Sequence, residues 1–408
     1  DRFDLRKDIV FNAEVSAARY DDARERWALK AEGVGASEAR FVEMATGCLT
    51  IPKDVNLPGM ETFKGEVYNA PRWPQTMPDF GEMIEIADGI LWTCIPLPYR
   101  LDHVNIYFLR DGDGWAVIDT GIRTEEAIGI WEAIFAGPMR GARITRVIVT
   151  HAHPDHIGLA GWMCARFDAP LLTSFSTYMG CQVISQGRSE TATRHSFDFY
   201  RSHGMSEELA SLVAIRGNEY LNRVTPLPLE FLRLVMADVI EIGTRSFRVM
   251  TGEGHAQEQV MLYCEDEKLL FSADQVIERI SPNISVFEGD PHGDPLGHFL
   301  RSLRLMRSEL PDDVLVLSGH RRPFYGLHAR CAELEVHHEE RCDLIRDACA
   351  TAPRSVADLV PVLFPRTLDP HQMSFAFTET LALVNRLVRR AEIETRESEE
   401  RIVHVPAG

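Results

Sequence analysis

Between positions 150 and 156 the chain reads Thr150-His151-Ala152-His153-Pro154-Asp155-His156, with three imidazoles and one carboxylate in its last six residues. The β-branched run at 143–149 precedes it and predicts a buried strand. The apolar run at 157–163 follows it and predicts the beginning of a helix. The histidines therefore lie in a loop that joins a strand to a helix.

This loop has the ligand types of a metal site. Side chains of an extended chain alternate, so His151 and His153 can point to one side while Asp155 and His156 point to a neighbouring position. Neutral imidazole and carboxylate are zinc ligands, so one loop can serve two ions. The alternative is a histidine-rich surface turn, which the rest of the chain disfavours.

Four further polar residues each end a short apolar run: Asp119, His255, Asp274 and His320. A single histidine at a strand end is more often structural than a ligand. Four such positions together with the histidine-rich loop predict one composite site.

At these residues the chain resembles the metallo-β-lactamase superfamily, whose five motifs occur in order over about residues 80–330. The resemblance implies an α+β fold, an αββα sandwich with two zinc ions per chain at one edge. It assigns one ion to His151, His153 and His255, and the other to Asp155, His156 and His320. Asp274 would bridge the ions and move a proton, and Asp119 would fix the loop and a ligand histidine. Catalytic roles thus go to Asp274, Asp155 and Asp119.

Composition excludes several classes of protein. The 408 residues are 45% hydrophobic and 25% charged, as in a globular protein, and the formal net charge is −18. This charge disfavours nucleic acid and anionic membrane as partners, and no apolar run approaches the ~20 residues of a membrane span. The eight cysteines contain no CxxC pair, which is typical of reduced thiols, so we expect a cytoplasmic protein.

Residues 1–77 differ from the rest and predict a β-rich fragment, with strands at 8–12 and 26–31. Here the chain resembles an internal piece of a Baeyer–Villiger-type flavin monooxygenase. The fingerprint FxGxxxHxxxWP is matched at Phe63, Gly65, Trp73 and Pro74, with Asn69 in place of the histidine. No dinucleotide-binding GxGxxG flanks this piece, so we expect no FAD and interpret it as a fusion remnant or a misjoined gene.

The proline-rich stretch at 71–78 predicts a linker and gives three domains, 1–77, 78–326 and 327–408. The last of these predicts helices and a two-stranded wing, and resembles the winged-helix-like tail of some superfamily members. Its alternating arginine and glutamate residues favour a role in packing or dimerisation over DNA binding. A homodimer is therefore one of the expected alternatives.

Two regions predict substrate contacts. His103 and Asn105 lie on one face of a strand, where they either border the cleft or satisfy a strand end. Residues 175–235 form a helical insertion that carries Arg194 and Arg201. This insertion is either a solvated cover or a lid whose arginines bind an anionic substrate.

The prediction is a metal-dependent hydrolase of the glyoxalase II or lactonase type. It would cleave an ester, thioester or lactone of a small molecule through a metal-bridging hydroxide. True β-lactamases of the superfamily generally lack the bridging aspartate, so Asp274 argues against antibiotic hydrolysis. The alternative is a metal-dependent endoribonuclease or phosphodiesterase, which the acidic charge disfavours.

Overall fold

The computed structural model describes residues 15–21, 24, 26–31, 35–39, 79–99, 101–216, 219–397 and 401–407. The chain divides into two units, Asp1–Pro74 and Gln75–Gly408. In the first unit, an antiparallel meander has the order β1-β2-β3, formed by β1 (Val15–Asp21), β2 (Arg26–Ala31) and β3 (Gly35–Ala39). The strand predicted at 8–12 and the monooxygenase-like motif at 63–74 lie outside the described residues.

In the second unit, the first sheet has seven strands in the order β10-β9-β8-β7-β6-β5-β4. Strands β4 to β7 form an antiparallel meander, and β8, β9 and β10 continue parallel to β7. Nearly every residue of β5, β6 and β7 is buried, as in a sheet covered on both faces. The strand bounds are β4 (Ile84–Ala87), β5 (Ile90–Pro96), β6 (His103–Asp111), β7 (Gly114–Ile118), β8 (Ile144–Ile148), β9 (Leu171–Thr173) and β10 (Leu232–Arg233).

The second sheet has five strands in the order β11-β12-β13-β14-β15. Its pairs are antiparallel except β14 with β15, which run parallel across the helix α8 (Pro295–Glu309). The strand bounds are β11 (Val239–Ile242), β12 (Arg245–Gly252), β13 (Gln259–Cys264), β14 (Leu269–Ala273) and β15 (Leu315–Ser318).

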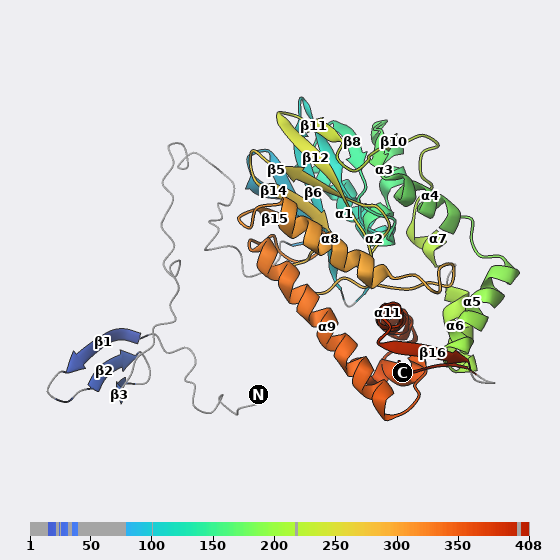
Figure 1. Cartoon of the computed structure of the whole chain (residues 1–408). Coiled ribbons are helices and arrows are strands. Elements are labelled where there is room, and N and C mark those ends of the chain that lie inside the picture. The colour runs from blue at the N-terminus through green and yellow to red at the C-terminus, as the bar shows by residue number, and fades with distance from the viewer. Residues whose placement is uncertain are drawn as a thin grey trace. The chain divides into compact units, whose positions relative to one another are not determined.

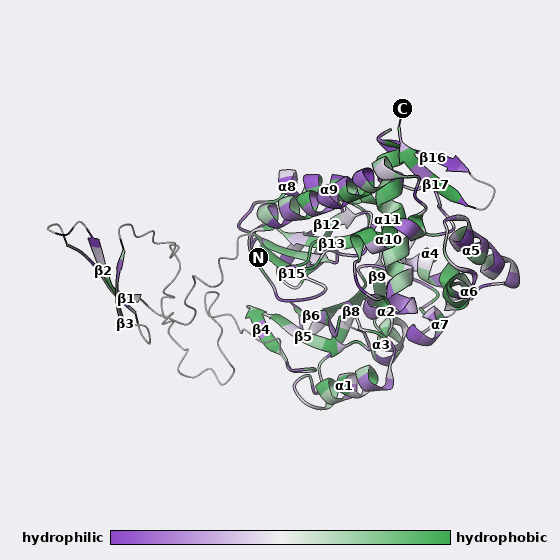
Figure 2. Ribbon diagram, turned by 90° about the horizontal axis from the view of Figure 1, so that it is seen from below, coloured by the Kyte–Doolittle hydropathy of each residue, from purple (hydrophilic) through white to green (hydrophobic). Residues whose placement is uncertain are grey.

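The sheets pack face to face between helices, which gives the predicted αββα order (Figure 2). Between the sheets, the rings of Tyr107 and Phe271 are 5.2 Å apart. Trp131 of α1 (Glu125–Ala136) packs on Phe108 of the first sheet at 5.8 Å, and α3 (Ala160–Phe167) contacts β8. On the other side, α8 covers the second sheet through the buried Phe299.

A C-terminal helical domain completes this unit (Figure 1). It comprises α9 (Leu327–Thr351), α10 (Val356–Leu363), α11 (Pro370–Arg389) and the antiparallel pair β16 (Ile393–Glu397) and β17 (Ile402–Pro406). Its apolar residues belong to the same core cluster as the outer face of the second sheet, so we call it the cap. The insertion after β9 forms α4 (Phe175–Ile184), α5 (Glu190–Ser202), α6 (Glu207–Arg216) and α7 (Tyr220–Arg223). Among the described residues, no helix is both long and apolar enough to span a bilayer.

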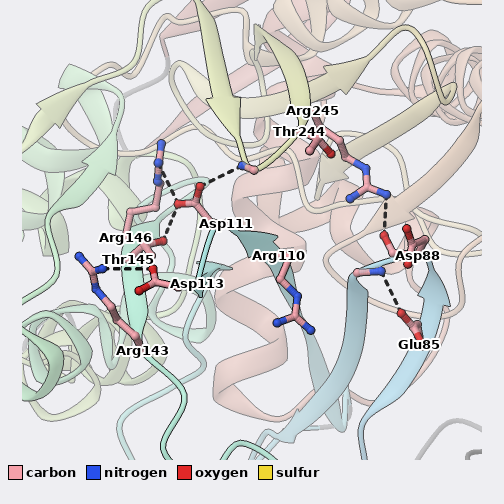
Figure 3. Close-up of a pocket in the computed structure, with 13 residues that line it drawn as sticks. Glu85, Asp88, Arg110, Asp111, Asp113, Arg143, Thr145, Arg146, Thr244 and Arg245 are labelled. Carbon is pink, nitrogen blue, oxygen red and sulfur yellow. Dashed lines mark hydrogen bonds and ion pairs between the residues drawn. The ribbon is translucent and has the colours of Figure 1, made fainter.

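A polar crevice of about 800 Å³ lies where the β6–β7 and β11–β12 turns meet (Figure 3). Three hydrogen bonds join the two sheets there. Arg146 donates to the carbonyl of Glu241, and the Gly243 amide donates to Asp111. The guanidinium of Arg245 donates to the carbonyl of Asp88 at 2.6 Å. These bonds fix the sheets at one end, while the opposite end carries the loops of the predicted site.

Candidate metal centre

The predicted ligands gather at the other end of the sandwich. The loop with His151, His153, Asp155 and His156 follows β8, and Asp119 follows β7. Strands β7 and β8 are parallel, as are β14 and β15, which are followed by Asp274 and His320. Carboxyl ends of parallel strands meet at one edge, so distant motifs come together.

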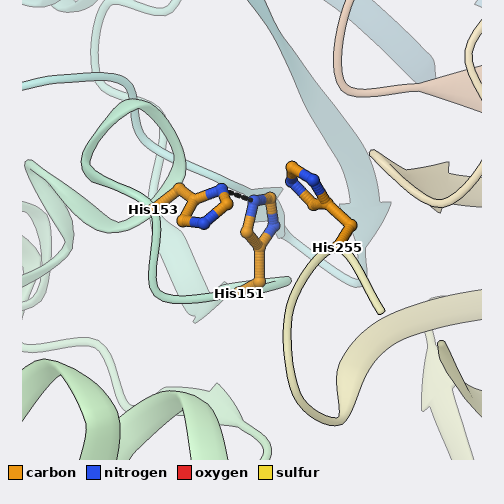
Figure 4. A group of neighbouring side chains, drawn as sticks. All are labelled: His151, His153 and His255. Carbon is orange, nitrogen blue, oxygen red and sulfur yellow. Dashed lines mark hydrogen bonds between the residues drawn. The ribbon is translucent and has the colours of Figure 1, made fainter. Parts of the chain in front are cut away.

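Three groups of side chains have ligand atoms within 4.8 Å of one another. One group joins His151 and His153 to His255, which comes from the loop after β12 (Figure 4). The other two groups are His151, His156 and Asp274, and Asp155, His156 and His320. All seven predicted metal ligands are therefore included.

The imidazoles are oriented by protein partners on one ring nitrogen. Nδ1 of His156 lies 2.7 Å from Asp119 Oδ2. Nδ1 of His255 lies 2.8 Å from the Asn283 carbonyl oxygen, and Nδ1 of His320 lies 2.7 Å from the His103 carbonyl oxygen. Each Nε2 is then left to face the centre, which is the arrangement of metal-binding histidines.

Unpartnered buried atoms show that a cation fits this centre. Nε2 of His156, Nε2 of His255 and Oδ1 of Asp274 are buried and lack a hydrogen-bond partner within the described residues. Such atoms are costly unless a ligand or ion satisfies them. In addition, His151 Nε2 and His153 Nδ1 are 3.0 Å apart. Two nitrogens on one tetrahedral zinc, each at ~2.0–2.1 Å, would be about 3.3 Å apart.

Asp274 lies between the two sides of the centre. Its Oδ2 is 3.4 Å from Nε2 of His255 and 3.2 Å from Nε2 of His320. It is also 3.5 Å from Nε2 of His156. One carboxylate is therefore close to ligands of both predicted sets.

Asp119 organises the histidine-rich loop. Its carboxylate accepts hydrogen bonds from the amide and hydroxyl of Thr150 and contacts His156. It is 2% exposed and has φ of +60°, a left-handed conformation that is uncommon outside glycine. Ala273 and Arg321, which flank Asp274 and His320, also have positive φ, +47° and +65°. Backbone strain of this kind collects at functional sites.

Gly319 leaves room for the centre. A Cβ at this position would lie 2.3 Å from Asp274 Oδ1 and 2.7 Å from His156 Cε1. Both distances are well below van der Waals contact. Only glycine allows the loop after β15 to pass this close to the ligands.

Burial and the carboxylates act differently on the histidines. Burial lowers the pKa of His151 well below its usual range and the pKa of His153 to about 3, so both rings are neutral. Burial would also lower the pKa of His320, but Asp274 and Asp155 outweigh it and raise that pKa to about 9. For Asp274 itself, burial opposes ionisation, but the neighbouring imidazoles hold its pKa well below the usual range. A cation bound on this side of the centre would compete with that proton.

His103 and Asn105 both contact the loop that carries His320. The Asn105 amide donates to the carbonyls of Ser318 and Arg321, and its oxygen accepts from Trp92. It is fully buried, so these contacts hold the loop that carries His320. His103 pairs with Asp102 and accepts from the Arg321 amide, as a satisfied strand end does.

Arg194 and Arg201 have partners on their own helix or just beyond its end. Arg194 is exposed and pairs with Asp198 at 3.0 Å. Arg201 donates to the carbonyl of Met205. Neither arginine belongs to the three ligand groups, and their contact with a substrate stays a prediction.

Thr150 and Asn283 contact the predicted site, and the sequence analysis gave neither of them a role there. Thr150 binds Asp119 and lies 3.0 Å from Nδ1 of His151. Asn283 holds His255 through its main-chain oxygen, which no side-chain pattern can reveal. Thr150 directly precedes the first histidine, and this position could have indicated a role for it at the site.

Comparison with known proteins identifies the family. Residues 99–174 and 183–320, just over half of the chain, match the metallo-beta-lactamase superfamily, to which the chain belongs. Residues 342–405 match the metallo-beta-lactamase-like C-terminal domain. With its histidine and aspartate clusters, the chain is a metal-dependent hydrolase by class.

Individual relatives agree with this assignment. "Probable metallo-hydrolase YqjP" of Bacillus subtilis (strain 168) is 22% identical over 308 residues, 69% of this chain and 87% of that protein. A beta-lactamase domain protein from Burkholderia ambifaria is 37% identical, with a TM-score of 0.76 over 82% of this chain and 96% of its own. A metallo-beta-lactamase family protein from Thermus thermophilus is 26% identical, with a TM-score of 0.68 over 79% of this chain and 100% of its own.

A short segment is similar to flavin monooxygenases, as predicted. Cyclopentanone 1,2-monooxygenase of Comamonas sp. (strain NCIMB 9872) is 39% identical over 74 residues. These residues are 18% of this chain and only 14% of the monooxygenase. The similarity therefore covers only a small part of that enzyme.

Proposed function

We propose that the chain is a binuclear zinc hydrolase that cleaves an ester, thioester or lactone of a small molecule. The observation that carries this proposal is the position of Asp274 Oδ2, within 3.5 Å of ring nitrogens from both ligand sets. One zinc ion would be held by His151, His153 and His255, and the other by Asp155, His156 and His320. Asp274 would be shared by both ions.

Two zinc ions would supply a water of lowered pKa and an electrophile for the scissile carbonyl. The protein residues have separate tasks. Asp274 orients the attacking water and passes its proton to the leaving group, and Asp155 balances charge beside His320. Asp119 keeps His156 in position through Nδ1. A serine or cysteine nucleophile is not needed for this chemistry.

The remaining parts of the chain have supporting roles in this proposal. Residues 78–326 form the hydrolase domain, residues 327–408 the winged-helix-like cap, and residues 1–77 a fragment that takes no flavin. The cap serves packing or a homodimer and does not read nucleic acid. A reducing cytoplasm is supported by the seven cysteines of the described residues, which are buried free thiols.

Metal content and substrate class test the proposal together. We expect two zinc equivalents per chain by elemental analysis, and turnover of at least one member of a panel of acyl thioesters, esters and lactones. Asp274→Asn should abolish turnover because the shared carboxylate is lost. Asp313→Asn is the matched control, since Asp313 is exposed and pairs with Lys268 away from the centre.

Salt dependence separates acyl hydrolysis from phosphodiester hydrolysis. The kcat/KM for a small acyl substrate should change only modestly between 50 and 200 mM salt. An RNA substrate that neutralises several phosphates should lose orders of magnitude over that range through counterion release. RNA cleavage with a steep salt slope, without turnover of any acyl substrate, would replace this proposal with the phosphodiesterase alternative. One zinc per chain that extra zinc does not increase would exclude the binuclear site.

A further inference from the structure

The three ligands assigned to the first ion come from two separate loops. His151 and His153 belong to the histidine-rich loop after β8, whereas His255 belongs to the loop 253–258 between β12 and β13. The ring centroid of His255 is 5.1 Å from that of His151 and 4.5 Å from that of His153. The two loops must keep this spacing if the three side chains are to share one ion.

Glu258 ends the His255 loop and fixes it to α4 of the insertion. Its carboxylate accepts hydrogen bonds from the Ser176 hydroxyl at 2.6 Å and from the Ser176 amide at 3.1 Å. This amide lies in the first turn of α4, where N–H groups lack partners within the helix and a negative charge is favoured. The Ser176 hydroxyl above all holds the pKa of Glu258 below its usual range, so the carboxylate is charged at neutral pH.

The backbone of Glu258 is held in an unfavourable conformation. Its φ is +45°, in the left-handed region that is uncommon for residues other than glycine. Its amide donates to the Glu253 carboxylate at 3.3 Å, which closes the loop across its two ends. Strain of this kind persists only where surrounding contacts hold it. The contacts of Glu258 therefore help to give the His255 loop its shape.

One turn further along, α4 reaches the histidine-rich loop. Gly180 lies four residues after Ser176 and thus on the same face of the helix. A Cβ at Gly180 would lie 4.0 Å from the Cβ of Ala152, the residue between the first two ligand histidines. A single face of α4 therefore contacts both loops that carry the ligands of the first ion.

Two further bonds hold the histidine-rich loop in place. The hydroxyl of Tyr220 in α7, which belongs to the same insertion, donates to the Ala152 carbonyl at 2.8 Å. The two loops are also joined directly, because the Val260 amide at the beginning of β13 donates to the Thr150 carbonyl at 2.8 Å. The insertion thus adds side-chain contacts to a backbone connection between the loops.

We propose that Glu258 is a positioning residue for the first ion, and that α4 sets the spacing between His255 and the histidine-rich loop. The proposal rests on the binuclear zinc site proposed above. Glu258 does not touch the ion and acts through the loop that carries His255. The second ion depends on His320, which the His103 carbonyl holds from β6, so it should respond much less. In this proposal α4 is part of the metal site, and a lid would have to lie in the rest of the insertion.

Stepwise titration with zinc tests this assignment. With a chromophoric chelator as competitor, full-length Glu258→Ala should bind one of its two zinc ions about tenfold more weakly than wild type and the other nearly as tightly. Glu258→Gln keeps an oxygen that can accept from Ser176, so it should restore most of the affinity. Glu309→Ala is the matched control, since Glu309 pairs with Arg248 at the C-terminal end of α8.

A double variant tests whether Glu258 acts through Ser176. Ser176→Ala removes the hydroxyl bond and keeps the amide bond, so it should weaken the same zinc ion by less than Glu258→Ala does. The double variant should lose no more affinity than Glu258→Ala alone, because both changes break one interaction. Losses that add in the double variant would overturn the role of α4.

Hydrogen exchange of chelator-treated protein gives a readout that needs no metal. The amides of residues 253–258 should exchange faster in Glu258→Ala than in wild type or Glu309→Ala, because the loop has lost an anchor. If exchange rises in this way but wild type binds fewer than two zinc ions, the proposed binuclear function fails while the anchoring of the His255 loop stands. If wild type binds two zinc ions and Glu258→Ala either binds both as tightly as Glu309→Ala or weakens both equally, the positioning role is overturned.

Discussion

Two sets of buried histidines in the second unit have different environments. The first set is in the metal centre, and the second is His203, His338 and His404, which lie at or beside the cap. Both sets include a buried ring nitrogen without a hydrogen-bond partner in the described part of the chain. Yet the histidine and aspartate groups found within 4.8 Å among the described residues all lie in the centre. An unpartnered nitrogen therefore does not mark a ligand unless other ligand atoms converge on it.

Nearby carboxylates explain why the histidine pKa values differ between the two sets. In the centre, Asp274 and Asp155 overcome the effect of burial and raise the pKa of His320 to about 9. At the cap, burial acts without such a partner and lowers the pKa of His203 and His404 to about 4. One environment is suited to hold a cation, and the other keeps its imidazoles neutral.

Among changes that leave every predicted ligand in place, Gly319→Ala should give the largest effect, because it closes the space in which the ligands converge. The new Cβ would overlap Asp274 and His156, so one or both must move. We expect less than two bound zinc equivalents and a loss of at least about a hundredfold in kcat/KM, since a displacement near 1 Å can cost that much. Gly129→Ala is the control, because a Cβ there meets open space within α1. Full zinc content and activity in Gly319→Ala would refute the tight-packing argument.

Asp119→Asn should have an intermediate effect on the same centre. It keeps the size of the side chain but removes the charge that accepts from Thr150 and contacts His156. Zinc affinity should fall by about 10–100-fold, as for other residues that orient ligands. A competition titration with a chromophoric chelator measures this change. Unchanged affinity would show that the loop is held without the carboxylate.

His404→Gln should have the smallest effect, and it tests the cap histidines. Below pH 6.5 the unfolded chain takes up a proton that the folded chain refuses until about pH 4. The free energy of unfolding therefore falls through this window, by up to about 3 kcal/mol for this histidine. Urea unfolding of chelator-treated protein at pH 7 and pH 4.5 measures it, and the variant should lose less stability than wild type. The exposed His298→Gln should match wild type, and equal losses in all three proteins would contradict the assignment.

Sequence patterns predicted the elements and the ligands because both depend on local chemistry. The strand before His151 follows from its β-branched run, and helices were expected within residues 327–408, where α9 and α11 lie. The motifs around Asp119, His255 and His320 each end a strand, so the sheet order brings them together.

Contacts between segments that are distant in the sequence could not be predicted from it. The support of His255 by a main-chain carbonyl leaves no side-chain signal. The stack of Tyr99 on His371 joins a loop of the hydrolase domain to the cap, and neither residue belongs to a motif. Asn105 was expected at the cleft border or at a strand end, and only its buried contacts show that it holds the loop carrying His320.

The hydrogen bond from Asn283 to Glu379 also has a consequence for how such enzymes can be recombined. Asn283 belongs to the hydrolase domain and supports His255, whereas Glu379 belongs to the cap. If the hydrolase domain were transferred to another protein without its cap, Asn283 would lose its hydrogen bond to Glu379. Because Asn283 also supports His255, the position of that predicted metal ligand would be affected. The two domains are therefore expected to be inherited together, and an exchange of caps between relatives should succeed only where an acceptor equivalent to Glu379 comes with the new cap.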